Sequence, residues 1–242
     1  MPLRSLLHIS LAGINPDLDA SRFDGIEGGG DVSVWFENRL KELGLSQAVH
    51  LRSVHVFEGE ALPEPESADA VVLGGSYRSI YEGLPWQSEV MAWLESYRGT
   101  GRPLLGICGG HQMVSMLGGA RVEPFEDGPL VGSLPVTLSE AGRRHFLFDG
   151  FPDRPEFHFG NSDHVLAAPE DSVVLASSGG LEVDALDFGG QWVTVQFHPE
   201  ASHELIAREF VQTHPDFVAR FHPVPDAPKV VVNFLKGTGV ID

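Results

Sequence analysis

The chain has 242 residues, of which 42% are hydrophobic, 28 are glycine and 17 are proline. This apolar content excludes an intrinsically disordered chain and can supply a packed core with many turns. The 34 acidic and 16 basic residues give a net charge of −18, which makes nucleic acid and anionic membrane surfaces poor partners. A single cysteine excludes an internal disulfide and favours a reducing, cytoplasmic location. No apolar run approaches the roughly 20 residues of a membrane span.

From the N-terminus, the chain alternates between short apolar runs and amphipathic segments. Residues 6–12 and 70–73 are continuous apolar runs, which are typical of strands covered on both faces of a sheet. Between them lies a helical pattern that Asp31 can cap and Gly44 can end. A second helix is predicted over residues 86–97, after the second strand.

The rest of the chain repeats this alternation, with one interruption. Buried strands are predicted over residues 103–107 and 192–197. One helix follows Cys108 directly, and another is predicted over residues 202–213. The region 132–186 instead contains alternating strands, which are typical of an antiparallel sheet. These strands cover residues 133–138, 173–177 and 181–187.

The order of these elements predicts the fold class. Strands that alternate with helices indicate an α/β fold with a mainly parallel sheet and helices on both faces. The alternating strands predict a small antiparallel extension on one side of that sheet. We find no internal repeat and no low-complexity linker, so residues 1–242 are predicted to form a single domain.

The most informative stretch is residues 103–112, PLLGICGGHQ. A buried strand runs into a G-x-C-x-G turn and a helical pattern follows at once, which is the arrangement of a nucleophile elbow with cysteine in place of serine. The helix points its amino end at the sulfur of Cys108, which favours the thiolate. The N–H of Gly109 can help to bind the oxyanion of a tetrahedral intermediate. Because a lone cysteine is usually a small buried apolar residue, the turn alone leaves the catalytic and structural interpretations equally open.

A thiolate nucleophile needs a histidine that moves protons and a third group that holds the ring. Of the 11 histidines, only His198 is placed like such a base. It ends an apolar strand, and active sites of open α/β folds lie at the carboxyl edge of the sheet. Pro199 stops the strand, and Glu200 is close enough to accept a hydrogen bond from the ring. Without Glu200, a histidine that caps a strand end would be the better interpretation.

These residues resemble a known family. Residues 106–112 match the G-I-C-x-G-x-Q nucleophile motif of the class I (triad-type) glutamine amidotransferases, and residues 195–200, VQFHPE, match their second motif. Residues 72–76 resemble the oxyanion-strand loop of the family. Residues 81–86 resemble the following segment in stand-alone, GMP-synthetase-like members. The resemblance covers roughly residues 70–210 and implies a flavodoxin-like sheet.

The resemblance also implies roles for individual residues. Cys108 would attack the side-chain amide carbon of glutamine and form a glutamyl thioester. His198 would protonate the departing ammonia and then activate water, while Glu200 orients His198. The backbone N–H groups of Gly75 and Gly109 would form the oxyanion hole. No metal or organic cofactor is implied, and the implied substrate-binding residues are Gln112, Gly74 and Asp163.

The chain departs from the family pattern at three places. Gly109 stands where the family usually has a larger side chain, which would leave the elbow looser. Ser76 follows Gly75 where proline is common, so the loop is expected to sit differently. In the substrate loop, Asn161 replaces a histidine and Asp163 is kept. Asp163 is expected either to bind the substrate ammonium or to form a surface Asx turn.

Three functions agree with this sequence. The first is an amidotransferase subunit that releases ammonia from glutamine for a separate synthetase, because no ATP-binding signature occurs in the chain. The second is a self-contained γ-glutamyl hydrolase or peptidase that forms the same thioester but releases a larger amine. The third is a non-catalytic binding protein, which the presence of Cys108, His198 and Glu200 disfavours.

Overall fold

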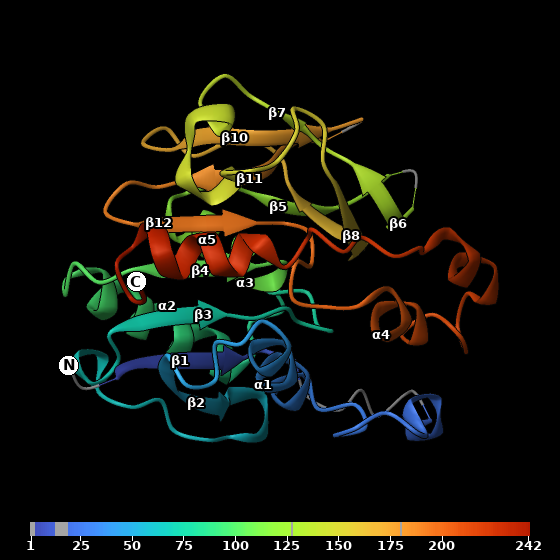
Figure 1. Ribbon diagram of the computed structural model, residues 1–242, viewed down its shortest axis with the longest axis horizontal. Helices are drawn as coiled ribbons and strands as arrows, with labels where there is room; N and C mark the ends of the chain where they lie inside the picture. Colours follow the sequence, from blue (N-terminus) through green and yellow to red (C-terminus); the bar gives the residue numbers. More distant parts are fainter. Residues whose placement is uncertain (1–2, 13–18, 127, 180) are drawn as a thin grey trace.

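An eight-stranded sheet runs through the protein (Figure 1). The computed structural model describes residues 3–12, 19–126, 128–179 and 181–242. The strand order is β2-β1-β3-β4-β12-β11-β10-β7. In that order, the strands are β2 (Val49–His55), β1 (Arg4–Ser10), β3 (Ala70–Leu73), β4 (Leu104–Ile107), β12 (Trp192–Val195), β11 (Leu181–Asp187), β10 (Val173–Ser178) and β7 (Thr137–Leu138).

The first five strands in this order are parallel, and the last three pair antiparallel. The parallel part has the strand order of a flavodoxin-like sheet. β3, β4 and β12 are buried along their whole length, as their continuous apolar runs predict. The predicted parallel sheet and its antiparallel extension are therefore confirmed.

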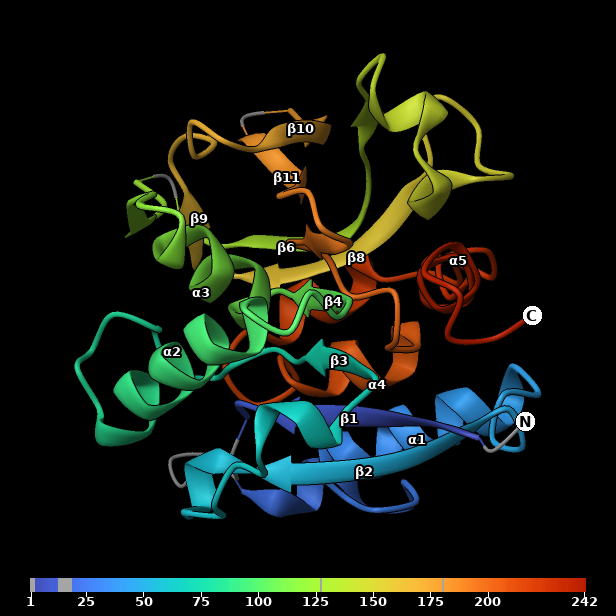
Figure 2. The same cartoon turned by 90° about the vertical axis from the view of Figure 1, so that its left-hand side faces the viewer.

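Helices cover both faces of the sheet (Figure 2). The two that lie on one face are α1 (Val32–Glu42) and α5 (Lys229–Gly237), and the two on the other are α2 (Pro85–Arg98) and α3 (Gly109–Leu117). Each face has its own apolar core: Phe36 and Phe234 belong to one, and Leu94 and Met113 to the other. Asp31 caps α1 as predicted, since its side chain accepts a hydrogen bond from the N–H of Ser33.

Two small antiparallel sheets and one short helix lie near the carboxyl edge of the main sheet. They are β5 (Val122–Pro124) with β9 (Asp163–Val165), β6 (Leu130–Pro135) with β8 (Glu156–Asn161), and α4 (His203–Arg208). Short 3-10 helices in the described chain cover Ala20–Phe23, Val56–Glu58, Pro65–Ser67, Gly142–Arg144, Phe146–Phe148 and Pro215–Arg220.

Some predicted boundaries are wrong. The strand predicted over 133–138 is divided, because residues up to Pro135 pair with β8 whereas Thr137 and Leu138 pair with β10. The helix predicted over 202–213 ends at Arg208. Beyond it, backbone N–H groups donate to carbonyls three residues back, which is the tighter pattern of a helix terminus.

β2 was not predicted from the sequence. Its residues, VHLRSVH, alternate between apolar and polar only over residues 49–52, and only Val49 and Val54, which point to opposite faces of the sheet, are buried. A search for continuous apolar runs misses such a strand, because it lies at the edge of the sheet and most of its residues are partly or fully exposed. In the part of the chain that the structure describes, no helix is both long and apolar enough to cross a membrane.

Candidate active site

Cys108 lies at a strained turn between β4 and α3. Its φ and ψ are 50° and −105°, which are rare for a residue with a side chain and typical of functional sites. The Cys108 N–H donates to the carbonyl of Val195 at 2.8 Å, and its carbonyl accepts from the N–H of Gln112 at 3.0 Å. The turn is therefore held by hydrogen bonds to the neighbouring strand and to the first turn of the helix.

The glycines around Cys108 are needed because backbone segments approach them closely. A β-carbon on Gly110 would collide with the carbonyl oxygen of Leu73. A β-carbon on Gly109 would lie 2.8 Å from both the backbone nitrogen and the β-carbon of Ser76. Gly109 and Ser76, two of the departures from the family pattern, thus lie against each other. The elbow is closely packed here, contrary to the expectation that a small residue loosens it.

His198 and Glu200 form the predicted pair. The Nδ1 atom of His198 lies 2.8 Å from Oε1 of Glu200. The segment that carries them is fixed at two backbone positions. The N–H of His198 donates to the carbonyl of His158 at 2.8 Å, and Nε of Arg39 on α1 donates to the carbonyl of Glu200 at 2.8 Å.

His198 and Glu200 each stabilise the charged form of the other. Burial by itself lowers the pKa of His198, but the charge of Glu200, the sulfur of Cys108 and their hydrogen bonds to the ring raise this pKa well above its usual value. Burial raises the pKa of Glu200, yet the His198 charge and hydrogen bond lower it below its usual value overall. His198 therefore retains a proton at neutral pH, and Glu200 is a carboxylate.

The loop after β3, which is predicted to form part of the oxyanion hole, meets the cysteine and the histidine. A β-carbon built on Gly75 would lie 3.6 Å from the β-carbon of Cys108 and 3.0 Å from Cε1 of His198. A side chain at this point would therefore press on the His198 ring. The carbonyl of Gly74 accepts a hydrogen bond from the N–H of Gly110 at 3.0 Å, which ties the loop to α3.

Gln112 connects α3 to the proposed substrate loop. Its Nε2 atom donates to the carbonyl of Asp163 at 2.9 Å and to Oε1 of Gln196 at 3.1 Å. Asn161 donates to the same Asp163 carbonyl at 2.9 Å. Both protons of the Gln112 amide are used in these bonds, so only its oxygen is left for a ligand.

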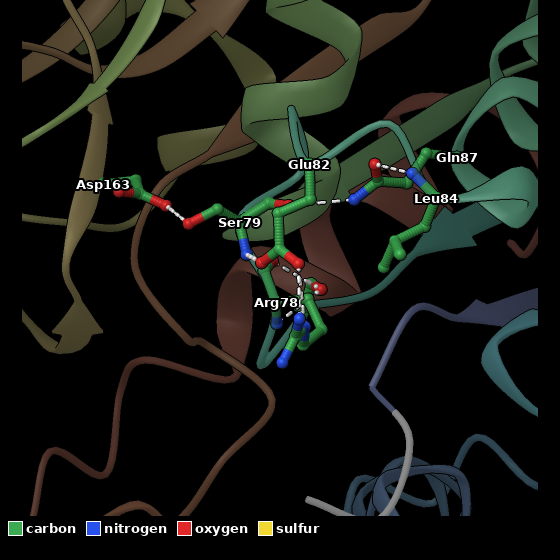
Figure 3. Close-up of polar contacts among 7 residues, drawn as sticks. Arg78, Ser79, Glu82, Leu84, Gln87 and Asp163 are labelled. Carbon is green, nitrogen blue, oxygen red and sulfur yellow. Dashed lines mark hydrogen bonds and ion pairs between the residues drawn. The ribbon is translucent and has the colours of Figure 1, made fainter.

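Asp163 is 9% exposed and belongs to β9, so the surface Asx turn considered for it is wrong. Its carboxylate accepts hydrogen bonds from Ser79 at 2.5 Å and from Tyr81 at 3.0 Å. Figure 3 shows how the loop that carries Ser79 is held. Glu82 accepts a hydrogen bond from the backbone of Ser79 at 3.0 Å, and Gln87 donates to the Ser79 carbonyl at 2.8 Å. The sequence did not predict this loop contact, because no motif links residues about 80 positions apart.

A second buried polar group lies at the rim of the site. Tyr77, which directly follows the oxyanion loop, donates to Glu209 beyond the end of α4. Arg22 lies 3.5 Å from the same carboxylate, and its side chain is 3% exposed. Burial and then the Glu209 charge raise the pKa of Tyr77 well above its usual value, so the hydroxyl stays protonated. This contact joins three distant segments beside Cys108.

These elements enclose one cavity of about 380 Å³. Seven of the eight predicted site residues line it: Cys108, His198, Glu200, Gly74, Gly75, Gln112 and Asp163. The eighth, Gly109, lies behind Cys108 against Ser76. Within the described residues, no three His, Cys, Asp or Glu side chains are grouped as they would be around a metal ion.

Comparison with known proteins places this site in a family. The sequence pattern of the family described as "Glutamine amidotransferase class-I" matches residues 27–217. The chain belongs to this family. Among curated relatives, a glutamine-hydrolysing GMP synthase of Aeropyrum pernix is 32% identical over 187 residues, which are 76% of this chain and 34% of the relative. One subunit of the glutamine-hydrolysing GMP synthase of Ignicoccus hospitalis is 31% identical over 158 residues, which are 62% of this chain and 80% of that subunit.

The chain thus spans about a third of the length of the Aeropyrum relative. Gamma-glutamyl peptidase 4 of Arabidopsis thaliana is 23% identical over 158 residues, covering 64% of this chain and 63% of the peptidase. The crystal structure of a glutamine amidotransferase from Thermotoga maritima superimposes with a TM-score of 0.68 at 21% identity, over 98% of this chain and 92% of that one. This last likeness concerns the fold alone.

Proposed function

We propose that this class-I amidotransferase hydrolyses the side-chain amide of glutamine through a thioester on Cys108. The observation that carries the proposal is the contact between a protonated His198 and Glu200 at 2.8 Å, at the point where the strained Cys108 elbow meets Gly75. The arrangement has the three parts of a cysteine-histidine-carboxylate triad.

In the first half of the reaction, the Cys108 thiolate attacks the amide carbon. The oxyanion that forms accepts hydrogen bonds from the N–H groups of Gly75 and Gly109. His198 then gives its proton to the amide nitrogen, the C–N bond breaks and ammonia leaves. A glutamyl thioester remains on the sulfur.

In the second half, His198 is neutral and takes a proton from a water molecule. The hydroxide attacks the thioester carbon, the C–S bond breaks and glutamate leaves. Cys108 returns as a thiolate beside a protonated His198, so the enzyme is regenerated. Glu200 holds the ring in the same orientation in both halves.

The ammonia would be used by a separate synthetase. Support comes from the Ignicoccus relative, which is named as one subunit of a GMP synthase and is covered over 80% of its length. A cytoplasmic location is part of this proposal, because a lone cysteine and a net charge of −18 suit a reducing compartment without membrane contact.

A γ-glutamyl hydrolase is the second candidate function. It would use the same thioester and release a larger amine. The 23% identical gamma-glutamyl peptidase favours it, as does a cavity within the roughly 300–1,000 Å³ range of sites for drug-sized ligands.

Glutamine hydrolysis by the purified chain, with Cys108→Ala and Cys108→Ser, tests the proposal. Both substitutions should lower kcat by at least about 10³-fold, because the thiolate is lost. Circular dichroism and Tm should stay close to those of the unmodified chain. Unchanged glutamate release in either variant would remove the proposal.

A further inference from the structure

The cavity is lined by residues from helices on both faces of the sheet, Gln112 from α3 and Trp35 from α1. Gln112 and Asp163 lie with α3, which covers one face of the sheet. Glu200 is tied to α1 on the opposite face, since Arg39 donates to its carbonyl at 2.8 Å (Figure 2). The departing nitrogen takes its proton from His198, whose partner Glu200 is held by α1, so the part of the cavity that α1 lines is the part available to the leaving amine.

The α1 side of the cavity is lined by Val32, Trp35 and Phe36. The indole N–H of Trp35 donates to the carbonyl of Gly29 at 2.8 Å, so it is not available to a ligand. The ring centroid of Phe36 lies 4.7 Å from that of His8 in a stacked arrangement. Phe36 is 1% exposed and supports this wall from behind, so the partly exposed Trp35 and Val32 offer the carbon surface, which suits an apolar group. Ammonia alone would leave this surface uncovered.

The charges around the cavity select against a leaving group that carries a carboxylate. Of the described residues that line it, Arg78 is the only lysine or arginine, and its guanidinium is 2.6 Å from Glu82. Glu200 and Glu209 also line the cavity. Glu200 is already paired with the protonated His198, and Glu209 with Arg22 and Tyr77, so among the described lining residues the α-carboxylate of a released amino acid would find no unpaired cation.

We propose that Val32, Trp35 and Phe36 form a leaving-group subsite for γ-glutamyl amides of neutral amines with an aromatic or branched apolar substituent. The inference rests on amide cleavage by Cys108 as proposed above. The C–S bond forms and the C–N bond breaks, the amine leaves with the proton from His198, and water releases glutamate from the thioester. The subsite adds a substrate class to that reaction and favours amines over amino acids.

Four substrates test the subsite on the full chain: glutamine, γ-glutamyl-methylamide, γ-glutamyl-benzylamide and γ-glutamyl-phenylalanine. We expect kcat/KM for the benzylamide to exceed that for the methylamide by at least about tenfold, since a filled apolar pocket gives discrimination of that order. The phenylalanine conjugate has the same ring with an added carboxylate and should be cleaved more slowly than the benzylamide. Equal values for the benzylamide and the methylamide would overturn the inference.

Variants of α1 locate the effect. Trp35→Ala should abolish the preference for the benzylamide and leave kcat/KM for glutamine within about threefold, because ammonia needs no apolar wall. Trp35→Phe should keep most of the preference. Glu37→Ala, at an exposed position of the same helix, is the matched control. It should leave kcat/KM unchanged for both glutamine and the benzylamide. If Trp35→Ala lowers kcat/KM for glutamine and for the benzylamide by the same factor, the assignment of Trp35 to the subsite is contradicted.

Binding to the Cys108→Ala chain separates this inference from the proposed function. Calorimetry should give at least about tenfold tighter binding of the benzylamide than of the methylamide, and Trp35→Ala should remove the difference. If the unmodified chain cleaves none of the four substrates but this binding holds, the proposed function fails and with it the leaving-group role, while the apolar binding site at Trp35 stands. If glutamine is cleaved and the benzylamide binds no better than the methylamide, the subsite fails alone.

Discussion

At the scale of single residues, the site depends on one ion pair next to one sulfur. The side chains of His198 and Glu200 are each 18% exposed, and each shifts the pKa of the other in the direction that keeps both charged. A protonated ring beside Cys108 is the state required for attack by a thiolate and for protonation of the leaving nitrogen. The contact with Glu200 also fixes which ring nitrogen faces the cysteine.

Glu200→Gln should weaken catalysis and change its pH dependence. The neutral amide removes the carboxylate charge that raises the pKa of His198, so this pKa should fall. The alkaline limb of kcat/KM should move to lower pH, because His198 loses its proton earlier, and kcat should drop by about 10²-fold. A pH series of glutamine hydrolysis measures both effects. Glu204→Gln, on the exposed surface of α4, should reproduce the unmodified profile; a Glu200→Gln profile that also does so would exclude the assigned role.

At the scale of elements, loops from distant parts of the chain pack against the turn at Cys108. The elbow at Gly109 touches Ser76, and the loop after Ser76 holds Asp163 through Ser79 and Tyr81. A displacement of the oxyanion loop would therefore reach both the reacting centre and the glutamyl side of the cavity. Such a displacement of about 1 Å is enough to cost on the order of 10²-fold in rate.

Gly109→Val should impair both activity and stability. Its side chain would strike Ser76, whose backbone nitrogen lies 2.8 Å from the site of the added β-carbon. We expect kcat for glutamine to fall by about 10²-fold and the free energy of unfolding to fall by about 1–3 kcal/mol. Kinetics and urea unfolding measure the two effects. Gly179→Val is the control, since no atom within 4 Å meets a β-carbon there, and a Gly109→Val chain with control-like kinetics would contradict the packing argument.

At the scale of the whole molecule, the sheet contains a buried acid outside the proposed mechanism. Asp184 on β11 is fully buried, and among the described residues neither carboxylate oxygen has a hydrogen-bond partner. Burial raises the pKa of Asp184 from 3.8 to about 7. Between these two values, the unfolded chain loses this proton and the folded chain keeps it. Asp184 therefore makes the fold less stable as pH rises from about 4 to about 7, and the loss is complete above that range.

Asp184→Asn should stabilise the protein at alkaline pH only. A shift of about three pKa units corresponds to on the order of 4 kcal/mol above pH 7, and the neutral amide avoids this cost. The gain in the free energy of unfolding should be largest near pH 8 and small near pH 4.5. Urea unfolding at both pH values measures it. Glu182→Gln, at an exposed position of the same strand, should show no such pH dependence, and a gain for Asp184→Asn of equal size at both pH values would contradict the titration.

The fold and family were readable from local sequence. The apolar runs of β3, β4 and β12 and the cap at Asp31 reflect backbone and burial preferences within a few residues, so no distant contact was needed. The two motifs around Cys108 and His198 predicted the amidotransferase family, which the match over residues 27–217 confirms. The roles of the site residues and the single domain over 1–242 stay predictions.

Other features depend on residues far apart in the chain. Arg22 meets Glu209, Ser79 meets Asp163, and α1 supplies part of the cavity wall. No local pattern encodes these contacts, because each partner alone is an ordinary polar or apolar residue. The sequence by itself determined the buried strands β3, β4 and β12, the turn at Cys108 and the family. Only the tertiary structure decided the shape and charge of the cavity, since these arise when separate elements pack together at the edge of the sheet.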